Sequence, residues 1–327
     1  MKIVAAIRTH VWTDQEDRIM AQLAPIFGDE LCVVFHNRPK GLSVPLPVVD
    51  LTDRFLRRHG LRYLDDYGWR CGDYFLYALR LARPDADLYW LIEPDVYFTG
   101  DPSDFFTRAS ASDADLLGVS TEVLKPNHRF AMSLKGVTPI RCIFALTRIS
   151  GRAIDRVFEL RKDYGKAKVR PRNYSNDEVF VWSHMMADPT MTTAELLYML
   201  PDWMGAHAFR ADPDILVDTL ADITSPGVYH PVQSRAHFVR AVGRRVSDSM
   251  IFLERMRASL ANLTDAEMDT LIANVATTVE TSLRSVRAQA IEQDSEITGA
   301  VAVAVMPDDE LEGQDDVEHT EPARKAG

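Results

Sequence analysis

The stretch LYWLIEPDVYFTGD, residues Leu88–Asp101, places five apolar residues that favour a strand directly before two acids, Glu93 and Asp95. Residues two apart in a strand face the same side, with Cα atoms about 7 Å apart. Pro94 cannot donate a hydrogen bond to a sheet, so the regular strand should end here. The pattern predicts a buried strand that ends in two carboxylates pointing the same way.

The chain around this stretch alternates apolar runs with segments of helical spacing. Residues 2–7 and 30–37 are short apolar runs typical of buried parallel strands, and residues 14–27 between them have helical spacing. Further strands are predicted at residues 44–51, 88–92, 116–121 and 139–150, and further helices at residues 72–83, 102–115, 150–165 and 176–188. This β-α-β order predicts an α/β fold with a mostly parallel, doubly wound sheet flanked by helices.

The two acids occupy the part of such a sheet that binds ligands. Open α/β sheets bind their ligands at the carboxyl ends of the strands, where Glu93 and Asp95 are expected. Two neighbouring carboxylates resist joint ionisation unless a cation lies between them. A hard divalent ion with oxygen ligands resolves that conflict, whereas a turn with two solvated acids is the alternative.

The motif in its context resembles that of GT-A-type glycosyltransferases, in which an apolar strand leads into an acidic D-x-D or, less often, E-x-D motif. The resemblance covers roughly residues 2–231 and implies a GT-A-like, Rossmann-type catalytic domain. It also implies that Glu93 and Asp95 hold Mn²⁺ or Mg²⁺, and that the ion bridges the diphosphate of a nucleotide-sugar donor. Glutamate in place of the commoner first aspartate leaves the metal dependence open. The most similar subgroup is bacterial and associated with surface polysaccharide.

In that family the exit of the first strand holds the nucleoside. The resemblance therefore implies that Arg8, Thr9 and His10 belong to the nucleotide-sugar site. The alternative is a polar turn in which Thr13 or Asp14 caps the next helix.

Three further residues are candidates for donor or acceptor contacts. Asp73 and Arg70 precede the metal-binding strand and face the nucleotide in one interpretation, whereas Asp73 is a plain helix N-cap in the other. Trp69 and Tyr74 are predicted to be core residues. Arg141 enters an apolar strand and needs an acidic partner, which is the diphosphate, the acceptor or a structural carboxylate.

The segment RPRNYSNDEVFVWSH supplies candidates for the catalytic base. Inverting members of the family use a carboxylate to take the proton from the acceptor hydroxyl, often at the start of a buried helix. The resemblance implies Asp177 or Glu178 in this role, with a slight preference for Asp177 and with Ser175 or Asn176 as the helix cap. The alternative is that both acids only favour the positive end of the helix.

The family often places a histidine late in the fold as a third metal ligand. His230 is the best positional match, with His237 and then His207 in reserve. A histidine among oxygen ligands favours Mn²⁺ over Mg²⁺. The alternative is that His230 is a loop histidine without a ligand role.

The sequence after about residue 244 has a different character. It is helical in pattern and lacks a strand signal, and Thr264 and Glu267 have the spacing of a capping box at the start of a second helix. Residues beyond 307 have no apolar pattern. We predict a GT-A-like catalytic domain at 1–243, a helical extension at 244–295 and a flexible acidic tail at 296–327. The extension either packs on the catalytic domain or forms a homo-oligomer.

Composition limits the classes of partner. The 327 residues carry a formal net charge of −11, whereas a nucleic-acid-binding surface needs a dense cationic face. Three scattered cysteines indicate reduced thiols. No apolar run reaches the roughly 20 residues of a membrane span, and the N-terminus lacks a secretory core. We predict a cytoplasmic protein without nucleic-acid partner or integral membrane segment, with peripheral attachment to the inner membrane left open.

These observations predict a metal-dependent glycosyltransferase. It moves a sugar from a nucleoside-diphosphate donor to a glycan, a lipid-linked molecule or another hydroxyl acceptor, with inversion expected and retention left open. A sugar-phosphate nucleotidyltransferase is an alternative, although residues 7–15 lack the glycine-rich loop usual in those enzymes. A degenerate nucleotide-binding or scaffold protein that acts through the C-terminal helices is another.

Overall fold

The structure is a computed structural model that describes residues 1–205, 208–211, 214–239 and 264–304. The chain divides into two units, Met1–Arg245 and Val246–Gly327. The limits given above for the three parts of the chain stay predictions. His207, the last of the reserve metal ligands, lies outside the described residues.

A seven-stranded sheet with the order β3-β2-β1-β4-β7-β6-β8 forms the centre of the first unit. Only β7 runs antiparallel to its neighbours β4 and β6, and the other paired strands of the sheet are parallel. The predicted mostly parallel α/β fold is thereby confirmed. The strands are β1 (Ile3–Thr9), β2 (Leu31–His36), β3 (Val48–Leu51), β4 (Leu88–Ile92), β6 (Leu116–Val123), β7 (Ile140–Ser150) and β8 (Thr193–Glu195).

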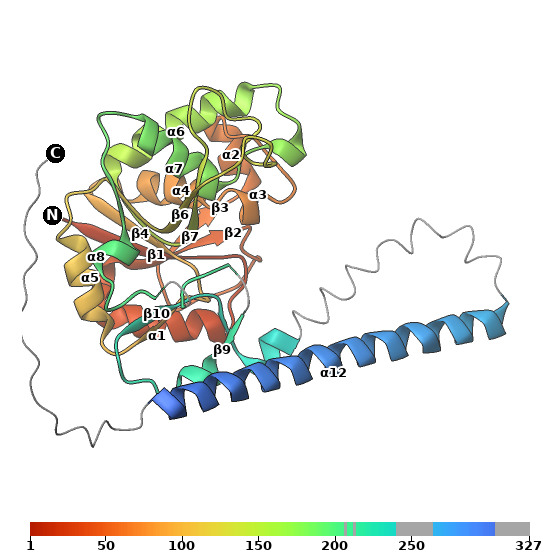
Figure 1. The fold of residues 1–327 in the computed structure, drawn as a ribbon. Helices are drawn as coiled ribbons and strands as arrows, with labels where there is room; N and C mark the ends of the chain where they lie inside the picture. Colours follow the sequence, from red (N-terminus) through yellow and green to blue (C-terminus); the bar gives the residue numbers. More distant parts are fainter. Residues whose placement is uncertain (206–207, 212–213, 240–263, 305–327) are drawn as a thin grey trace, which may run out of the picture. The chain divides into compact units, whose positions relative to one another are not determined.

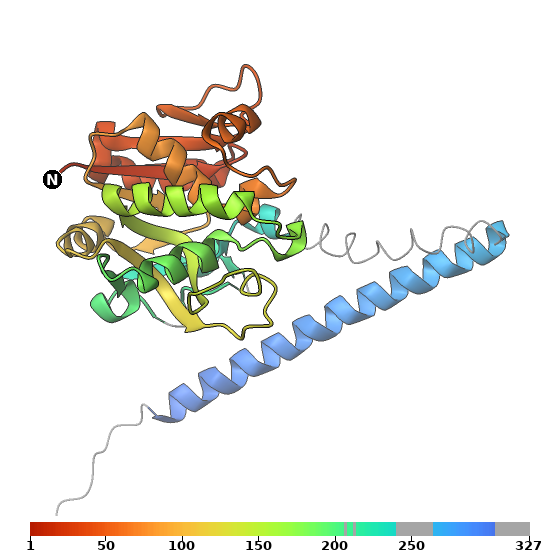
Figure 2. The same cartoon turned by 90° about the horizontal axis from the view of Figure 1, so that it is seen from above.

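Helices cover both faces of this sheet, as Figure 1 and the turned view in Figure 2 show. Two apolar clusters fill the space between the layers. The first cluster takes side chains from α2 (Asp53–His59), α4 (Asp73–Ala82), α6 (Gly151–Lys166) and α7 (Asp177–Ala187), and the second from α1 (Asp14–Phe27), α5 (Pro102–Ser110) and α8 (Leu196–Met199). Because both faces are covered, β1 and β4 are almost continuously apolar.

Local capping fixes where the helices next to the sheet begin. Thr13 caps α1 in a capping box with Glu16, so the predicted cap at this position is confirmed. Asn176 caps α7 by accepting a hydrogen bond from Val179 N, which resolves the choice between Ser175 and Asn176. These caps fix the first residues of α1 and α7.

A two-stranded sheet brings a late segment of the chain to the end of β4. Strand β5 (Tyr97–Thr99) pairs antiparallel with β10 (Gly227–Tyr229). The next residue, His230, is consequently held near Glu93 and Asp95, and Val232 N donates to Asp95 O at 2.8 Å. Strand β9 (Ile215–Leu216) pairs with β11 (Val232–Gln233) and extends this arrangement.

The described part of the second unit is a single helix, α12 (Asp265–Ala304). The predicted capping box is confirmed, because Thr264 N donates to Glu267 Oε2 at 2.8 Å and Glu267 N donates to Thr264 Oγ1 at 3.3 Å. The helix predicted for residues 246–263 lies outside the described residues. Among the described residues, no helix is both long and apolar enough to cross a bilayer.

Candidate active site

Two carboxylates and one imidazole converge at the carboxyl end of β4. Glu93, Asp95 and His230 each offer one ligand atom, and these atoms lie within 4.8 Å of one another. Glu93 and Asp95 follow β4 directly, and His230 follows β10, which β5 holds in place. The structure thus brings together the three residues predicted as metal ligands.

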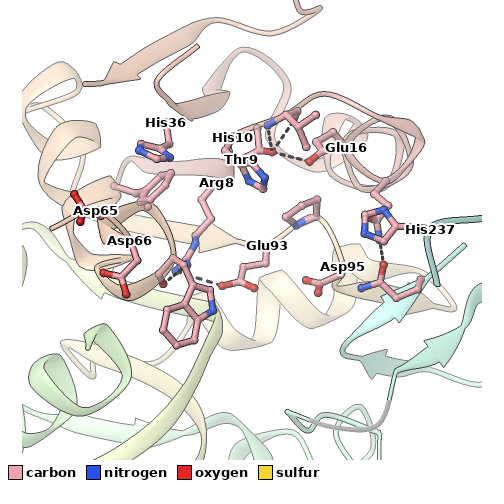
Figure 3. A pocket seen from close by; sticks show the side chains of 17 residues that line it. Arg8, Thr9, His10, Glu16, His36, Asp65, Asp66, Glu93, Asp95 and His237 are labelled. Carbon is pink, nitrogen blue, oxygen red and sulfur yellow. Dashed lines mark hydrogen bonds and ion pairs between the residues drawn. The ribbon is translucent and has the colours of Figure 1, made fainter. Parts of the chain in front are cut away.

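The histidine is oriented towards the acids by the backbone. His230 Nδ1 lies 2.7 Å from Arg210 O, and its Nε2 lies 3.6 Å from Asp95 Oδ1 and 3.9 Å from Glu93 Oε2. A carbonyl that holds one ring nitrogen leaves the other directed at the acids, which is the usual support of a metal-binding histidine. On the other side of Glu93, Arg8 Nη1 lies 3.3 Å from Glu93 Oε1, as Figure 3 shows.

Burial and charge shift the pKa values of this cluster in different directions. Burial opposes the ionisation of Glu93, but the charges of Arg8 and His230 outweigh it and lower the pKa of Glu93 to about 2. Burial raises the pKa of Asp95 to about 6, with His230 opposing and Glu93 adding to the rise. Burial favours the neutral imidazole, yet the two carboxylates raise the pKa of His230 to about 9. Without a metal, an imidazolium therefore balances the acids at neutral pH.

The residues present fit a divalent cation. Asp95 Oδ1 is buried and has no hydrogen-bond partner among the described residues, so an oxygen with lone pairs to spare points into the cluster. Two carboxylates with one imidazole are a donor set that suits Mn²⁺, because imidazole is a softer ligand than the oxygen donors that Mg²⁺ prefers.

Arg8 connects this cluster to the acids at the start of α7. Its Nη1 donates to Asp177 Oδ2 at 3.0 Å. Gly72 N donates to the same oxygen at 2.8 Å, and Glu178 N donates to Asp177 Oδ1 at 2.9 Å. Both Asp177 oxygens are thus occupied by donors of the protein itself. A Cβ at position 72 would overlap Arg8 Nη1 and Asp177 Oδ2, so the close approach at Gly72 requires glycine.

Glu178 is the more available of the two α7 acids. Its Oε2 accepts a hydrogen bond from Asn176 Nδ2 at 2.9 Å, and its Oε1 accepts none from the described residues. Burial raises the pKa of Glu178, although Asn176 and the charge of Arg141 oppose the rise. Burial likewise raises the pKa of Asp177 to about 7, against the charge of Arg8. A carboxyl group with a raised pKa is suited to accept a proton near neutral pH.

Two cavities meet at the cluster. The first, of about 380 Å³, lies at the ends of β1 and β4, and the second, of about 590 Å³, lies towards α7. Arg8, Trp69, Glu93, Asp95 and Gln233 line both cavities. Each volume falls in the range of small-molecule sites. The cluster is therefore positioned to contact ligands in both cavities at once.

The predicted site residues divide between these cavities. Thr9 and His10 line the first cavity beside Arg8, which Figure 3 shows, and Thr9 Oγ1 also donates to Glu16 Oε1 at 2.6 Å. Asp177, Glu178 and Arg141 line the second. Arg141 is partly exposed rather than buried, and its Nη2 lies 2.7 Å from Glu122 Oε1.

Two expectations for the segment before α4 are wrong. Asp73 neither lines a cavity nor caps α4 with its side chain, because both its oxygens accept hydrogen bonds from Arg161, at 2.6 and 2.8 Å, deep in the core. Trp69 is not a core residue but is 62% exposed at the junction of the cavities, whereas Tyr74 is buried as predicted. Arg70 pairs with Asp66 at 2.5 Å.

Several lining residues carry no local sequence signal. Asp66, His36 and Phe75 line the first cavity, and His128 and Arg129 line the second. They come from a strand end, a helix and loops that only the tertiary fold brings together. Trp69, in the short helix Tyr67–Arg70, likewise gave no local signal of its exposure.

No protein-family model matches the chain, and no curated protein sequence matches it either. Its structural neighbours are glycosyltransferases and nucleotidyltransferases of GT-A-like fold. The mannosyltransferase Ktr4p from S. cerevisiae is 11% identical, and the comparison covers 56% of this chain and 65% of that chain at a TM-score of 0.33. A glycosyltransferase involved in the glycosylation of the major capsid of PBCV-1 is 6% identical, and the comparison covers 59% of this chain and 81% of that chain at a TM-score of 0.32.

A third neighbour is the 4-diphosphocytidyl-2C-methyl-D-erythritol synthase from Anaerococcus prevotii. It is 8% identical, with 59% of this chain and 87% of that chain covered at a TM-score of 0.36. At these identities the similarity concerns the fold alone.

Proposed function

We propose that this protein is a metal-dependent glycosyltransferase that moves a sugar from a nucleoside-diphosphate donor to a hydroxyl acceptor. The observation that carries the proposal is the convergence of Glu93, Asp95 and His230 within 4.8 Å at the junction of two cavities. A site that holds a diphosphate at such a junction can direct the nucleoside into one cavity and the sugar towards an acceptor in the other.

The donor is proposed to occupy the first cavity. Thr9 and His10 at the end of β1, with Asp66 opposite, offer polar groups for the base and the ribose. Arg8 lies beside Glu93 and supplies positive charge next to the diphosphate. Its guanidinium is held by Asp177, so it is oriented before the donor arrives.

Glu93, Asp95 and His230 would hold the divalent ion, with Mn²⁺ favoured over Mg²⁺. When bound, the ion supplies Lewis-acid stabilisation of the negative charge that develops on the departing diphosphate. The chain's own contribution is to hold the three ligands together and to keep Arg8 beside them.

Glu178 is proposed as the general base, with Asp177 as a positioning residue. Asp177 has both oxygens engaged by Arg8, Gly72 and Glu178 itself, whereas Glu178 lines the acceptor cavity with one oxygen available. Glu178 takes the proton of the acceptor hydroxyl as its oxygen bonds to the anomeric carbon. The bond from that carbon to the diphosphate oxygen breaks, and the nucleoside diphosphate leaves. This single displacement inverts the anomeric configuration.

The test is a panel of UDP-, GDP-, CDP- and dTDP-sugars incubated with the protein, Mn²⁺ and glycan acceptors. The expected result is release of one nucleoside diphosphate and a glycosylated product of inverted configuration. Parallel reactions with nucleoside triphosphates and sugar phosphates distinguish the nucleotidyltransferase alternative, which releases pyrophosphate. Turnover in those reactions alone would contradict the proposal.

A further inference from the structure

Six exposed cations form a basic face beside the second cavity. Three lie in the loop of residues 124–139 between β6 and β7, and three lie in residues 167–173 after α6. Neither segment contains an acid. The members of the basic face are Lys125, Arg129, Lys135, Lys168, Arg170 and Arg172.

None of these six side chains has a carboxylate partner among the described residues. Elsewhere on the first unit, several arginines pair with carboxylates, as in the pairs Arg38–Asp50 at 2.9 Å and Arg108–Asp202 at 2.6 Å. The chain as a whole carries a net charge of −11. A run of unpaired cations on an acidic protein is a local excess that favours an anionic partner.

Contacts within the first unit hold the two segments together. Ser133 Oγ donates to Asn173 O at 2.6 Å and also lies in hydrogen-bond contact with Tyr164 Oη. The Arg70 guanidinium packs over the Phe130 ring at 5.7 Å and donates to Pro171 O. The two cationic segments therefore lie side by side, and Arg129 of the first segment also lines the second cavity.

Exposed apolar side chains accompany the cations. Trp69, next to Arg70, is 62% exposed, and Met132 in the same loop as Arg129 is 55% exposed. Tyr63 is 51% exposed and its ring contacts Tyr67 at 5.8 Å. Tryptophan and tyrosine are enriched at membrane interfaces because one part of each ring system is apolar and the other polar.

We propose that the basic face docks on the surface of an anionic lipid bilayer and brings the mouth of the second cavity to that surface. Clusters of four to eight lysines and arginines are the composition that recognises anionic lipid headgroups. A bilayer is favoured over a soluble polyanion because Met132, which lies between Arg129 and Lys135 and lines neither cavity, offers apolar area that the headgroup and acyl boundary can cover. An acceptor anchored in that bilayer would then reach the second cavity from its membrane side.

The test is co-sedimentation of the full chain with vesicles of phosphatidylcholine alone and of phosphatidylcholine with 30% phosphatidylglycerol, a content of about one-third anionic lipid. We expect binding to the anionic vesicles only, and its loss at about 1 M salt, where the Debye length falls to about 3 Å. Replacing Lys168, Arg170 and Arg172 by glutamine should weaken partition by about 100-fold, since each cation contributes a factor of about five. None of these three lines either cavity.

A triple variant with the same charge change elsewhere is the control. Lys40, Arg108 and Arg156 are exposed on the first unit and are not members of the basic face, so their replacement by glutamine should leave partition unchanged. Nucleotide binding by both triple variants verifies folding and is independent of docking. Absence of binding to anionic vesicles would overturn the proposal, and so would an equal loss of binding in the control variant. Binding to dextran sulfate without binding to vesicles would show that the basic face takes a soluble polyanion instead.

Discussion

Glu178 and Asp177 are neighbours in sequence but have different environments. Asp177 accepts hydrogen bonds on both oxygens and faces Arg8, so it stabilises the arrangement of the site. Glu178 lines the second cavity and has a raised pKa because it is buried. The difference supports the proposal that Glu178 transfers the proton and that Asp177 is a positioning residue.

Replacement of Glu178 by glutamine should therefore lower kcat by about 10²- to 10⁴-fold, the usual contribution of a general base. Binding of the nucleoside diphosphate should change little, because the side chain lies on the acceptor side. Steady-state kinetics and calorimetry measure the two effects separately. Glu159→Gln, on the exposed side of α6, is the control that should retain full turnover. An unchanged kcat in Glu178→Gln would contradict the assignment.

The raised pKa of His230 links metal binding to pH. At pH 7 the metal-free imidazole is protonated, since its pKa is about 9, whereas a metal ligand must be the neutral form. We expect release of about one proton per Mn²⁺ bound, so that the affinity rises as the pH rises towards 9. Calorimetry in two buffers with different ionisation enthalpies measures the proton count.

His230→Gln should remove this proton release, and His237→Gln should leave it intact. Equal heats in the two buffers for the unaltered protein would show that no protonated ligand is displaced. Loss of proton release in the His237 variant alone would transfer the ligand role to His237, the reserve candidate.

At this scale the sequence predicts what is local. Glu93 and Asp95 follow from strand periodicity and Pro94, because residues two apart in a strand share a face. His230 depended on a family resemblance, since the pairing of β5 with β10 joins segments far apart in the chain. Trp69 was wrongly assigned to the core, because the sequence does not distinguish an aromatic side chain packed in the core from one that lines a cavity.

The position of the start of α7 depends on a buried ion pair between α6 and α4. Arg161 of α6 and Asp73 of α4 are both 0% exposed, and Arg161 Nη1 also donates to Ser175 O at 2.9 Å, just before the cap of α7. The guanidinium packs over the Phe180 ring at 3.8 Å. The pair thus connects three helices and holds the segment that carries Asp177 and Glu178.

Arg161→Met should lower the free energy of unfolding by about 3–5 kcal/mol, because it leaves Asp73 buried without its partner. Thermal and denaturant unfolding measure the loss. Lys166→Met on the same helix is the control, since its partner Asp163 is highly exposed and the pair should add nothing measurable. Equal stability of the two variants would show that the buried pair does not organise α7.

Elements with a strong apolar period were predicted closely. Residues 88–92 and 14–27 form β4 and α1 with the predicted bounds, since continuous burial gives a clear pattern. The predicted strand at 44–51 shrinks to Val48–Leu51 at the sheet edge. The antiparallel direction of β7 and the short strands β5 and β10 carry no such pattern, because their partners are set by long-range packing.

At the scale of the whole molecule, α12 has an apolar repeat of its own. Residues Met268, Ile272 and Val275 recur eleven positions later as Val279, Leu283 and Val286. An eleven-residue repeat suits association with another helix of the same period in a slightly right-handed coiled coil. Ile272, Leu283 and Val286 are exposed in the single chain. A second copy of this chain would supply a helix of the same period.

We therefore expect the full chain to self-associate and Leu283→Glu to shift it towards the monomer. Sedimentation equilibrium measures the change. Thr278→Glu, which lies outside the apolar repeat, is the matched control and should keep the oligomer. A monomeric unaltered chain at all concentrations would contradict this prediction and leave the first unit's site unaffected.

The most direct test of the central claim is calorimetric titration with UDP, GDP, CDP and dTDP, with and without Mn²⁺. The proteins compared are the unaltered chain, Glu93→Ala, Asp95→Ala and, as control, Asp113→Ala at an exposed position outside both cavities. We predict that one nucleotide binds, that its binding requires Mn²⁺, and that binding is lost in both site variants but kept in the control. Absence of nucleotide binding, or binding that survives both site substitutions, would contradict the claim.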